Sequence, residues 1–140
     1  MNSNKFFLGG IVGGVVYFLL GYLFYGLLLK SFFDANSTTP IDTSKMIWWA
    51  MIVANLLAGF LFSFIIGKAK ASNMGSGAGI GFVVGLLMAL SYDLMGYSMN
   101  TSMSTSLKAI CVDAITAAVM SAIAGAAIGW VYGMGKKSAA

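Results

Sequence analysis

Hydrophobic residues are concentrated in four long runs that are separated by short polar segments. A helix needs about 20 mostly apolar residues to cross the hydrocarbon core of a membrane. Four runs reach this length: Phe6–Leu29, Met46–Gly67, Gly77–Ser98 and Leu107–Gly133. The pattern therefore predicts an all-α, polytopic membrane protein. We expect a single membrane domain, residues 1–140, built as an antiparallel bundle of four transmembrane helices.

The first run could be mistaken for a signal peptide, because Lys5 precedes it. The apolar core of a signal peptide has about 7–15 residues and is followed by an A-x-A-like cleavage site. Phe6–Leu29 is longer than such a core, and no site of this kind follows it. We expect this run to be retained as the first helix.

The segment before the second span contains residues that are typical of helix N-termini. Ser31–Lys45 is polar, and it includes Asp42, Thr43 and Ser44 close to the start of the next apolar run. The side-chain oxygens of these residue types accept hydrogen bonds from the free amides of a helix's first turn. We therefore expect this cluster to cap the second span.

The lysines indicate the direction of insertion, because positively charged segments remain in the cytoplasm. Four spans place both termini on one side of the membrane. The lysines of that side are Lys5, Lys68, Lys70, Lys136 and Lys137, with no acidic residue among them. The other side contains Lys30, Lys45 and Lys108, together with Asp34 and Asp42. The bias predicts that both termini are cytoplasmic.

Aromatic residues near the ends of the spans agree with this arrangement. Trp and Tyr side chains gather at the two interfaces between membrane and water. We expect Trp48 and Trp49 at the outer interface, and Trp130 and Tyr132 at the inner one.

Composition narrows the chemistry that the chain can perform. Of its residues, 59% are hydrophobic and 9% are charged, whereas a soluble domain has about 25% charged residues. There is no histidine and only one cysteine, Cys111, which excludes an intramolecular disulfide and the usual zinc and bis-His haem sites. The net charge of +4 is spread over short segments, which argues against a nucleic-acid partner. We expect the lipid bilayer as a partner and no cofactor.

Small residues recur at every fourth position of the last two spans. The third span has Gly77, Gly81, Gly85 and Ala89 before Asp93, and the fourth has Asp113, Ala117, Ser121, Gly125, Gly129 and Gly133. This spacing allows helix backbones to approach closely within a membrane. An antiparallel hairpin centred on Met103 would place Asp93 opposite Asp113. The same register predicts helix packing through Gly77, Gly81, Gly85, Ser121, Gly125 and Gly129.

The two aspartates are the candidate functional residues. Asp93 lies about five residues, or roughly 7.5 Å, from the end of its span, and an acid at this depth requires partners. The candidate partners at similar depth are Tyr22, Tyr25, Asn55, Tyr92 and Thr116. Two close carboxylates titrate as a unit, so the pair could share a proton or hold a cation. Alternatively, each aspartate faces a water-filled funnel, bonds to Tyr or Ser, or pairs with Lys108.

The stretch GYLFYGLLLKSFF, Gly21–Phe33, resembles the first span of a family of small bacterial four-span membrane proteins that is catalogued only as a domain of unknown function. In that family a glycine precedes an aromatic–tyrosine pair, a glycine or proline, and an aromatic-rich segment. Phe24, Tyr25 and Gly26 match these positions, with phenylalanine where the family often has tryptophan. The resemblance implies a four-helix membrane protein with no established reaction, and it supplies no site residues. We expect the protein to be located in the bacterial inner membrane.

These features support two functions. The first is a helix-packing interaction module, either a homo-oligomer or an accessory subunit of a membrane complex, because small-residue ladders occur on three spans and the connectors are short. The alternative is a small proton- or cation-coupled transporter or channel that uses Asp93 and Asp113 near the outer face. An enzyme is not expected, since no nucleophile–base set is visible.

Overall fold

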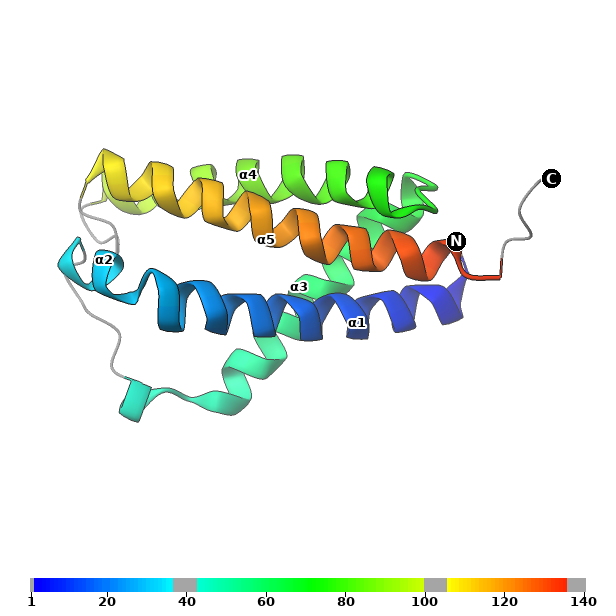
Figure 1. Ribbon diagram of the computed structural model, residues 1–140, viewed down its shortest axis with the longest axis horizontal. Helices are drawn as coiled ribbons and strands as arrows, with labels where there is room; N and C mark the ends of the chain where they lie inside the picture. The colour runs from blue at the N-terminus through cyan, green and yellow to red at the C-terminus, as the bar shows by residue number, and fades with distance from the viewer. Residues whose placement is uncertain (1, 37–42, 100–105, 136–140) are drawn as a thin grey trace.

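The computed structural model describes residues 2–36, 43–99 and 106–135, and their regular structure is entirely helical (Figure 1). Four helices are long and apolar enough to cross a membrane, which confirms the predicted all-α bundle of an integral membrane protein. The elements are α1 (Ser3–Gly21), η1 (Tyr22–Leu28), α2 (Lys30–Ala35), η2 (Thr43–Lys45), α3 (Trp48–Lys68), α4 (Met74–Ser98) and α5 (Leu107–Gly133). Each candidate membrane span begins and ends within three residues of the span expected for it, with α1 and η1 together forming the first span, Ser3–Leu28.

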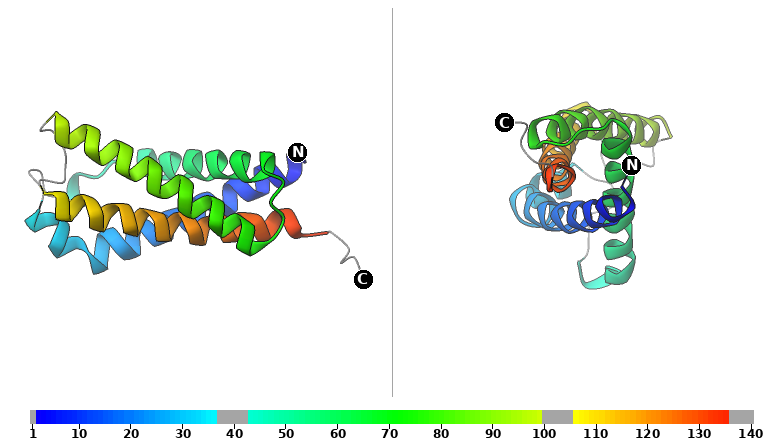
Figure 2. Two further views of the ribbon diagram at one scale, coloured as in Figure 1. Left: turned by 90° about the horizontal axis from the view of Figure 1, so that it is seen from above. Right: turned by 90° about the vertical axis from the view of Figure 1, so that its right-hand side faces the viewer.

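Helix α5 lies at the centre of the bundle. It runs antiparallel to α4 along the whole length of the hairpin, and α1 lies against its other side (Figure 2). Helix α3 crosses α1 obliquely and diverges from α4 and α5 towards one end (Figure 1). Because α5 lies between α4 and α1, it is the most buried of the four long helices, and six of its 13 buried positions are alanine or glycine.

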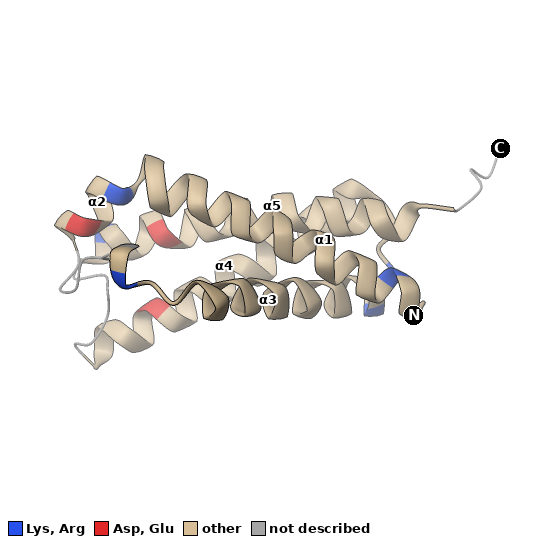
Figure 3. Cartoon of the chain, turned by 90° about the horizontal axis from the view of Figure 1, so that it is seen from below, with Lys and Arg blue, Asp and Glu red and all other residues tan. Residues whose placement is uncertain are grey.

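The charged residues of the described part of the chain lie towards the two ends of the bundle (Figure 3). We call the end with the C-terminus of α4 and the N-terminus of α5 the acidic end, because Asp34, Asp93 and Asp113 lie there. The opposite end contains Lys5, Lys68 and Lys70, and we call it the basic end. The acidic end is the predicted outer one. Lys136 and Lys137, which entered the prediction of orientation, lie outside the described residues.

The α4–α5 contact has the register that the small residues predict. Gly77 lies against Gly125 and Gly129, and Gly81 lies against Ser121 and Gly125. A Cβ atom at Gly81 would collide with the backbone oxygen of Ser121. The helices therefore approach so closely that only glycine fits at Gly77, Gly81, Gly125 and Gly129. Met103, the centre of the predicted hairpin, lies outside the described residues.

The glycines of the first span also pack within the chain. A Cβ at Gly10 would collide with the ring of Phe60, and a Cβ at Gly14 would come within 2.9 Å of the Leu56 Cα. The partner on α3 is Gly59, whose Cβ would collide with the backbone of Gly10 and Gly14. These contacts join α1 to α3, so they leave no glycine face of α1 for a second subunit at these positions.

The prediction of an N-terminal cap for the second span is wrong. Thr43–Lys45 forms the short helix η2, and α3 begins at Trp48 with Ile47 at its N-cap and no side-chain cap bond. Met46 and Ile47 separate the hydroxyl residues from the first turn of α3, which places them too far back to cap it. Asp42 lies outside the described residues. Asn2, Asn73 and Ser106 do cap their helices, α1, α4 and α5.

The first span differs from a regular helix in its last part. Tyr22–Leu28 forms a π-helix, and α2 then continues through Lys30–Ala35, where the polar pattern predicts a connector. The side chains of Lys30 and Asp34 form an ion pair of 2.7 Å across one turn of α2, and such pairs favour the helical conformation. π-Helical turns are rare and often occur at functional sites.

Candidate functional site

Asp93 and Asp113 meet between α4 and α5 at the acidic end. The glycine contact line fixes the two helices against each other as far as Gly85, which lies on Ser121. Two helical turns further on, Asp93 and Asp113 lie close enough for their carboxyl groups to interact directly. The Asp93 side chain is buried, with 8% of the residue exposed, and Asp113 is half-buried. The structure thus brings together the two acids that the hairpin register pairs.

Tyr25 is the third member of the site. Its phenolic hydroxyl donates a hydrogen bond of 2.6 Å to Oδ1 of Asp113, a length typical of a bond from a hydroxyl to an ionised carboxylate. Tyr25 lies in the π-helix η1, and its ring packs against Phe33 of α2 with 5.3 Å between the ring centroids. The site is therefore built where the first span, α4 and α5 converge.

One oxygen of the site has no partner. Within the described residues, Oδ2 of Asp93 is buried and makes no hydrogen bond. A buried carboxylate oxygen without a donor is costly, and a neighbouring ionised carboxylate only adds repulsion. A proton between Asp93 and Asp113 would remove both costs, because a protonated carboxyl group is a donor and carries no charge.

No lysine among the described residues reaches the two carboxylates. Lys30 is bound to Asp34, and Lys108 lies over the ring of Phe32, with its Nζ 5.9 Å from the ring centroid. The structure therefore pairs neither aspartate with Lys108, which was one of the alternatives. The charge of the pair has no cationic partner in the described part of the chain.

The structure places the other candidate partners elsewhere. Tyr22 and Tyr92 are 56% and 81% exposed on the outside of the bundle. Tyr92 precedes Asp93 directly, and neighbouring residues of an α-helix point about 100° apart, so only one of them can face α5. Asn55 donates to the backbone oxygen of Met51 on its own helix. Thr116 is buried but donates to its own helix, at the oxygen of Val112.

A second polar contact lies deeper in the bundle and was not predicted. The hydroxyl groups of Tyr17 and Ser121 are 3.0 Å apart, and the Tyr17 ring stacks on Phe62 with 5.8 Å between centroids. Gly85 leaves room for the Ser121 hydroxyl, since a Cβ there would collide with it. The sequence signal for this contact is Tyr17 itself, a tyrosine in the middle of an apolar run.

A third polar group lies near the basic end. Ser63 Oγ donates to the Phe6 backbone oxygen at 2.9 Å, and the Tyr132 hydroxyl donates to the Ser63 backbone oxygen at 3.1 Å. Lys5 Nζ donates to the Tyr132 backbone oxygen at 3.0 Å. Tyr132 is only 7% exposed, so at this end of α5 its side chain faces the inside of the bundle. Its hydroxyl has partners inside the bundle, so burial satisfies it better than the interface would.

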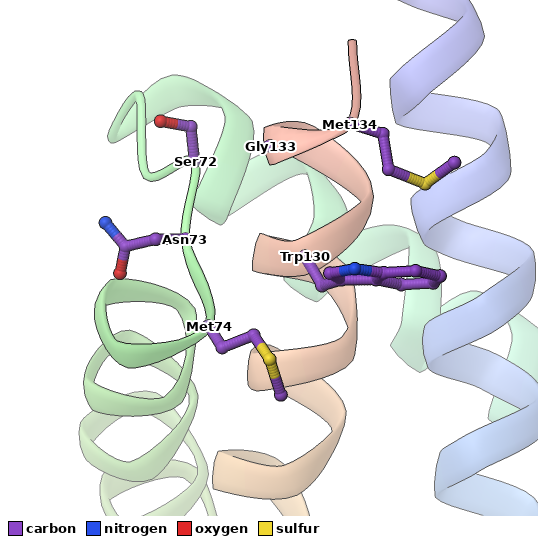
Figure 4. Close-up of a pocket in the computed structure, with 6 residues that line it drawn as sticks. All are labelled: Ser72, Asn73, Met74, Trp130, Gly133 and Met134. Atoms are coloured by element: carbon purple, nitrogen blue, oxygen red, sulfur yellow. The ribbon is translucent and has the colours of Figure 1, made fainter. Parts of the chain in front are cut away.

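A shallow hollow of about 300 Å³ lies at the basic end, lined by Ser72, Asn73, Met74, Trp130, Gly133 and Met134 (Figure 4). Ser72 and Asn73 point away from the Trp130 ring in this view, and the Asn73 side chain is occupied in capping α4. The hollow has no charged lining residue. It offers little chemistry compared with the carboxylate pair.

The fold and the site define an integral membrane bundle of four long helices with two neighbouring aspartates, Asp93 and Asp113, near one end. No family model, no curated protein and no solved structure matches this chain. The resemblance of Gly21–Phe33 to a family of small bacterial membrane proteins therefore stays a prediction.

Proposed function

We propose that this protein is a small proton- or cation-coupled transporter or channel of the bacterial inner membrane, with Asp93, Asp113 and Tyr25 as its ion-binding site. One observation carries the proposal: Asp93 has a buried oxygen without a hydrogen-bond partner in the described residues, directly beside a second carboxyl group. Ionisable groups within membrane-spanning helices are costly, and they mark the paths of ions and protons. No enzymatic reaction is proposed.

The position of the site supports entry of the ligand from the acidic end. Asp93 is about 7.5 Å from the end of α4, and Asp113 is about 9 Å from the start of α5, at 1.5 Å per residue. On the other side of the site, Phe62, Ile66 and Ile128 form a buried apolar core, and Tyr17 packs against it. Transport across the membrane would require this core to open, as in alternating access.

The packing-module hypothesis depended mainly on the glycine ladders. In the structure, Gly77, Gly81 and Gly85 contact α5, and Gly10 and Gly14 contact α3. The ladders therefore explain how one chain folds and do not indicate a second subunit. Self-association or assembly with other membrane subunits stays a prediction, which cross-linking in native membranes would measure. The transport proposal does not depend on its outcome.

The test is flux in liposomes that contain the purified protein. We expect a flux of protons or cations, driven by an imposed gradient, that falls to the level of protein-free liposomes in Asp113→Asn. The matched control is Asp34→Asn, because Asp34 lies at the same end but is bound to Lys30 on the surface of α2. This control should retain the flux. An unchanged flux in the double variant Asp93→Asn/Asp113→Asn would refute the proposal.

A further inference from the structure

We infer that the ligand of this site is a single proton, carried by Asp93 and shared with Asp113, and that the two aspartates have different roles. The inference rests on the proposed function and specifies its substrate. It depends on three observations: the number of oxygen ligands at the site, the unequal hydrogen bonding of the two carboxyl groups, and the absence of a compensating charge in the described residues around them.

The described side chains at the site supply few oxygen ligands for a metal cation. Calcium takes about six to eight oxygen ligands and magnesium about six, and sodium sites in transporters use backbone carbonyls from unwound helices. Helices α4 and α5 run unbroken past Asp93 and Asp113, so their carbonyls are used in helical hydrogen bonds. Among nearby hydroxyl groups, Tyr25 donates to Asp113 and Thr116 donates to Val112. A proton needs only two oxygens.

The two aspartates are not equivalent. Asp113 accepts the short hydrogen bond from Tyr25, which stabilises its ionised form. Asp93 receives no donor on its buried Oδ2, so its ionised form has the greater unmet cost. A proton on Asp93 makes that group a donor to Asp113. The ionised Asp113 is then the acceptor for two hydroxyl donors, Tyr25 and the protonated Asp93.

None of the neighbouring titratable groups named below supplies a positive charge that could take the place of the proton. Tyr17 of α1 bonds to Ser121, and Tyr25 of η1 bonds to Asp113. From α2, Lys30 and Asp34 bind each other. On the two helices of the site, Lys108 lies over Phe32, and Tyr92, Tyr97 and Cys111 are exposed. Among the described residues the ion pair found is Lys30–Asp34, and none joins a cation to Asp93 or Asp113, which favours protonation as the way to remove the charge of one carboxylate.

The experiment is infrared spectroscopy of the reconstituted protein during a pH titration. We expect a carbonyl band of a protonated carboxyl group that is lost when the pH is raised. Sodium, potassium or magnesium ions should leave the titration unchanged. The band should be absent from Asp93→Asn, which replaces a neutral carboxyl group by a neutral amide of the same shape and should therefore fold. It should persist in Asp34→Asn.

Two results would overturn the inference. A carboxylate spectrum that responds to sodium or potassium ions, without a protonated band, would make the ligand a cation and leave the proposed function intact. A band that persists in Asp93→Asn, with thermal unfolding showing that the variant is folded, would place the proton on another group. A band that behaves as expected in a protein without flux would refute the proposed function alone.

Discussion

Two groups of polar side chains lie inside the bundle near its opposite ends, and they differ in how completely their hydrogen bonds are satisfied. Near the basic end, the Ser63 and Tyr132 side chains are neutral, and the Lys5 ammonium group donates to a backbone oxygen. The hydrogen bonds of these three residues join α1, α3 and α5. Near the acidic end, Asp113 has a donor, whereas Asp93 has a buried oxygen without one among the described residues. The first arrangement costs little and holds helices together. The second is costly in the absence of a ligand.

The comparison separates polar residues that stabilise from those that bind. Buried hydroxyl groups occur near both ends, so burial of a polar group does not distinguish the two roles. The distinguishing feature is an ionisable side chain whose buried atom lacks a partner. Ser121 and Tyr17 lie between the two groups and bond to each other, and by this criterion they belong with the stabilising group.

The largest expected effect comes from Gly81→Leu. The new side chain would collide with the Ser121 backbone oxygen, so α4 and α5 must separate. We expect a loss of about 3 kcal/mol or more in unfolding free energy, at or beyond the upper range for overpacking, because a backbone atom cannot move aside as a side chain does. Separation would also part Asp93 from Asp113 and abolish flux. Denaturant unfolding in detergent micelles measures the stability.

Gly79→Leu is the matched control for this variant. Gly79 lies in the same helix, but a Cβ at that position has no neighbour within 4 Å. The substitution should change the unfolding free energy by less than about 0.5 kcal/mol, as is usual at surface positions. Equal stability of the two variants would mean that the α4–α5 contact is looser than the glycine line indicates.

A smaller effect is expected from Ser63→Ala, which tests the group near the basic end. The change removes the bond from Ser63 Oγ to the Phe6 oxygen and leaves that backbone oxygen with one partner fewer. We expect a loss of about 1 kcal/mol in unfolding free energy, the usual range for a hydrogen bond between helices in a membrane. Flux and the infrared band should not change.

Ser91→Ala is the control here, because Ser91 is exposed on α4 and should be neutral in both measurements. Loss of flux in Ser63→Ala at unchanged stability would contradict the comparison, since it would give the basic end a part in transport.

The spans and the register of the last two helices could be predicted from sequence because their signals are local. Apolar length defines a span, and the four-residue spacing of Gly77, Gly81 and Gly85 defines the line that contacts α5. Asp93 and Asp113 lie at the ends of these ladders. Their meeting therefore follows from a contact between helices that are neighbours in the chain.

The rest of the site depends on contacts between distant segments. Tyr22 and Tyr25 are equally good candidates in the sequence, and both lie in the π-helix η1, where Tyr25 bonds to Asp113 and Tyr22 is exposed. Local propensity does not predict a π-helical turn. The bonds of Tyr17 to Ser121 and of Tyr132 to Ser63 likewise depend on the rotation of α1 and α3 against α5, which composition and periodicity do not specify.

The smallest expected effect is a gain in stability at the basic end, from Lys70→Gly. Lys70 follows the C-cap of α3 with φ 57°, a left-handed conformation that costs a non-glycine residue about 1–2 kcal/mol. The amides of Lys70 and Ala71 bond to the oxygens of Gly67 and Ile66, the pattern of a helix end that normally has glycine at this position. Glycine relieves the strain but gives the unfolded chain more freedom, so the net gain should be below about 1 kcal/mol.

Ala69→Gly is the control, because Ala69 is right-handed with φ −74° and should lose stability. If the basic end only stabilises the fold, Lys70→Gly should raise the unfolding midpoint and leave flux unchanged, and a change in flux would show that the α3–α4 turn takes part in transport.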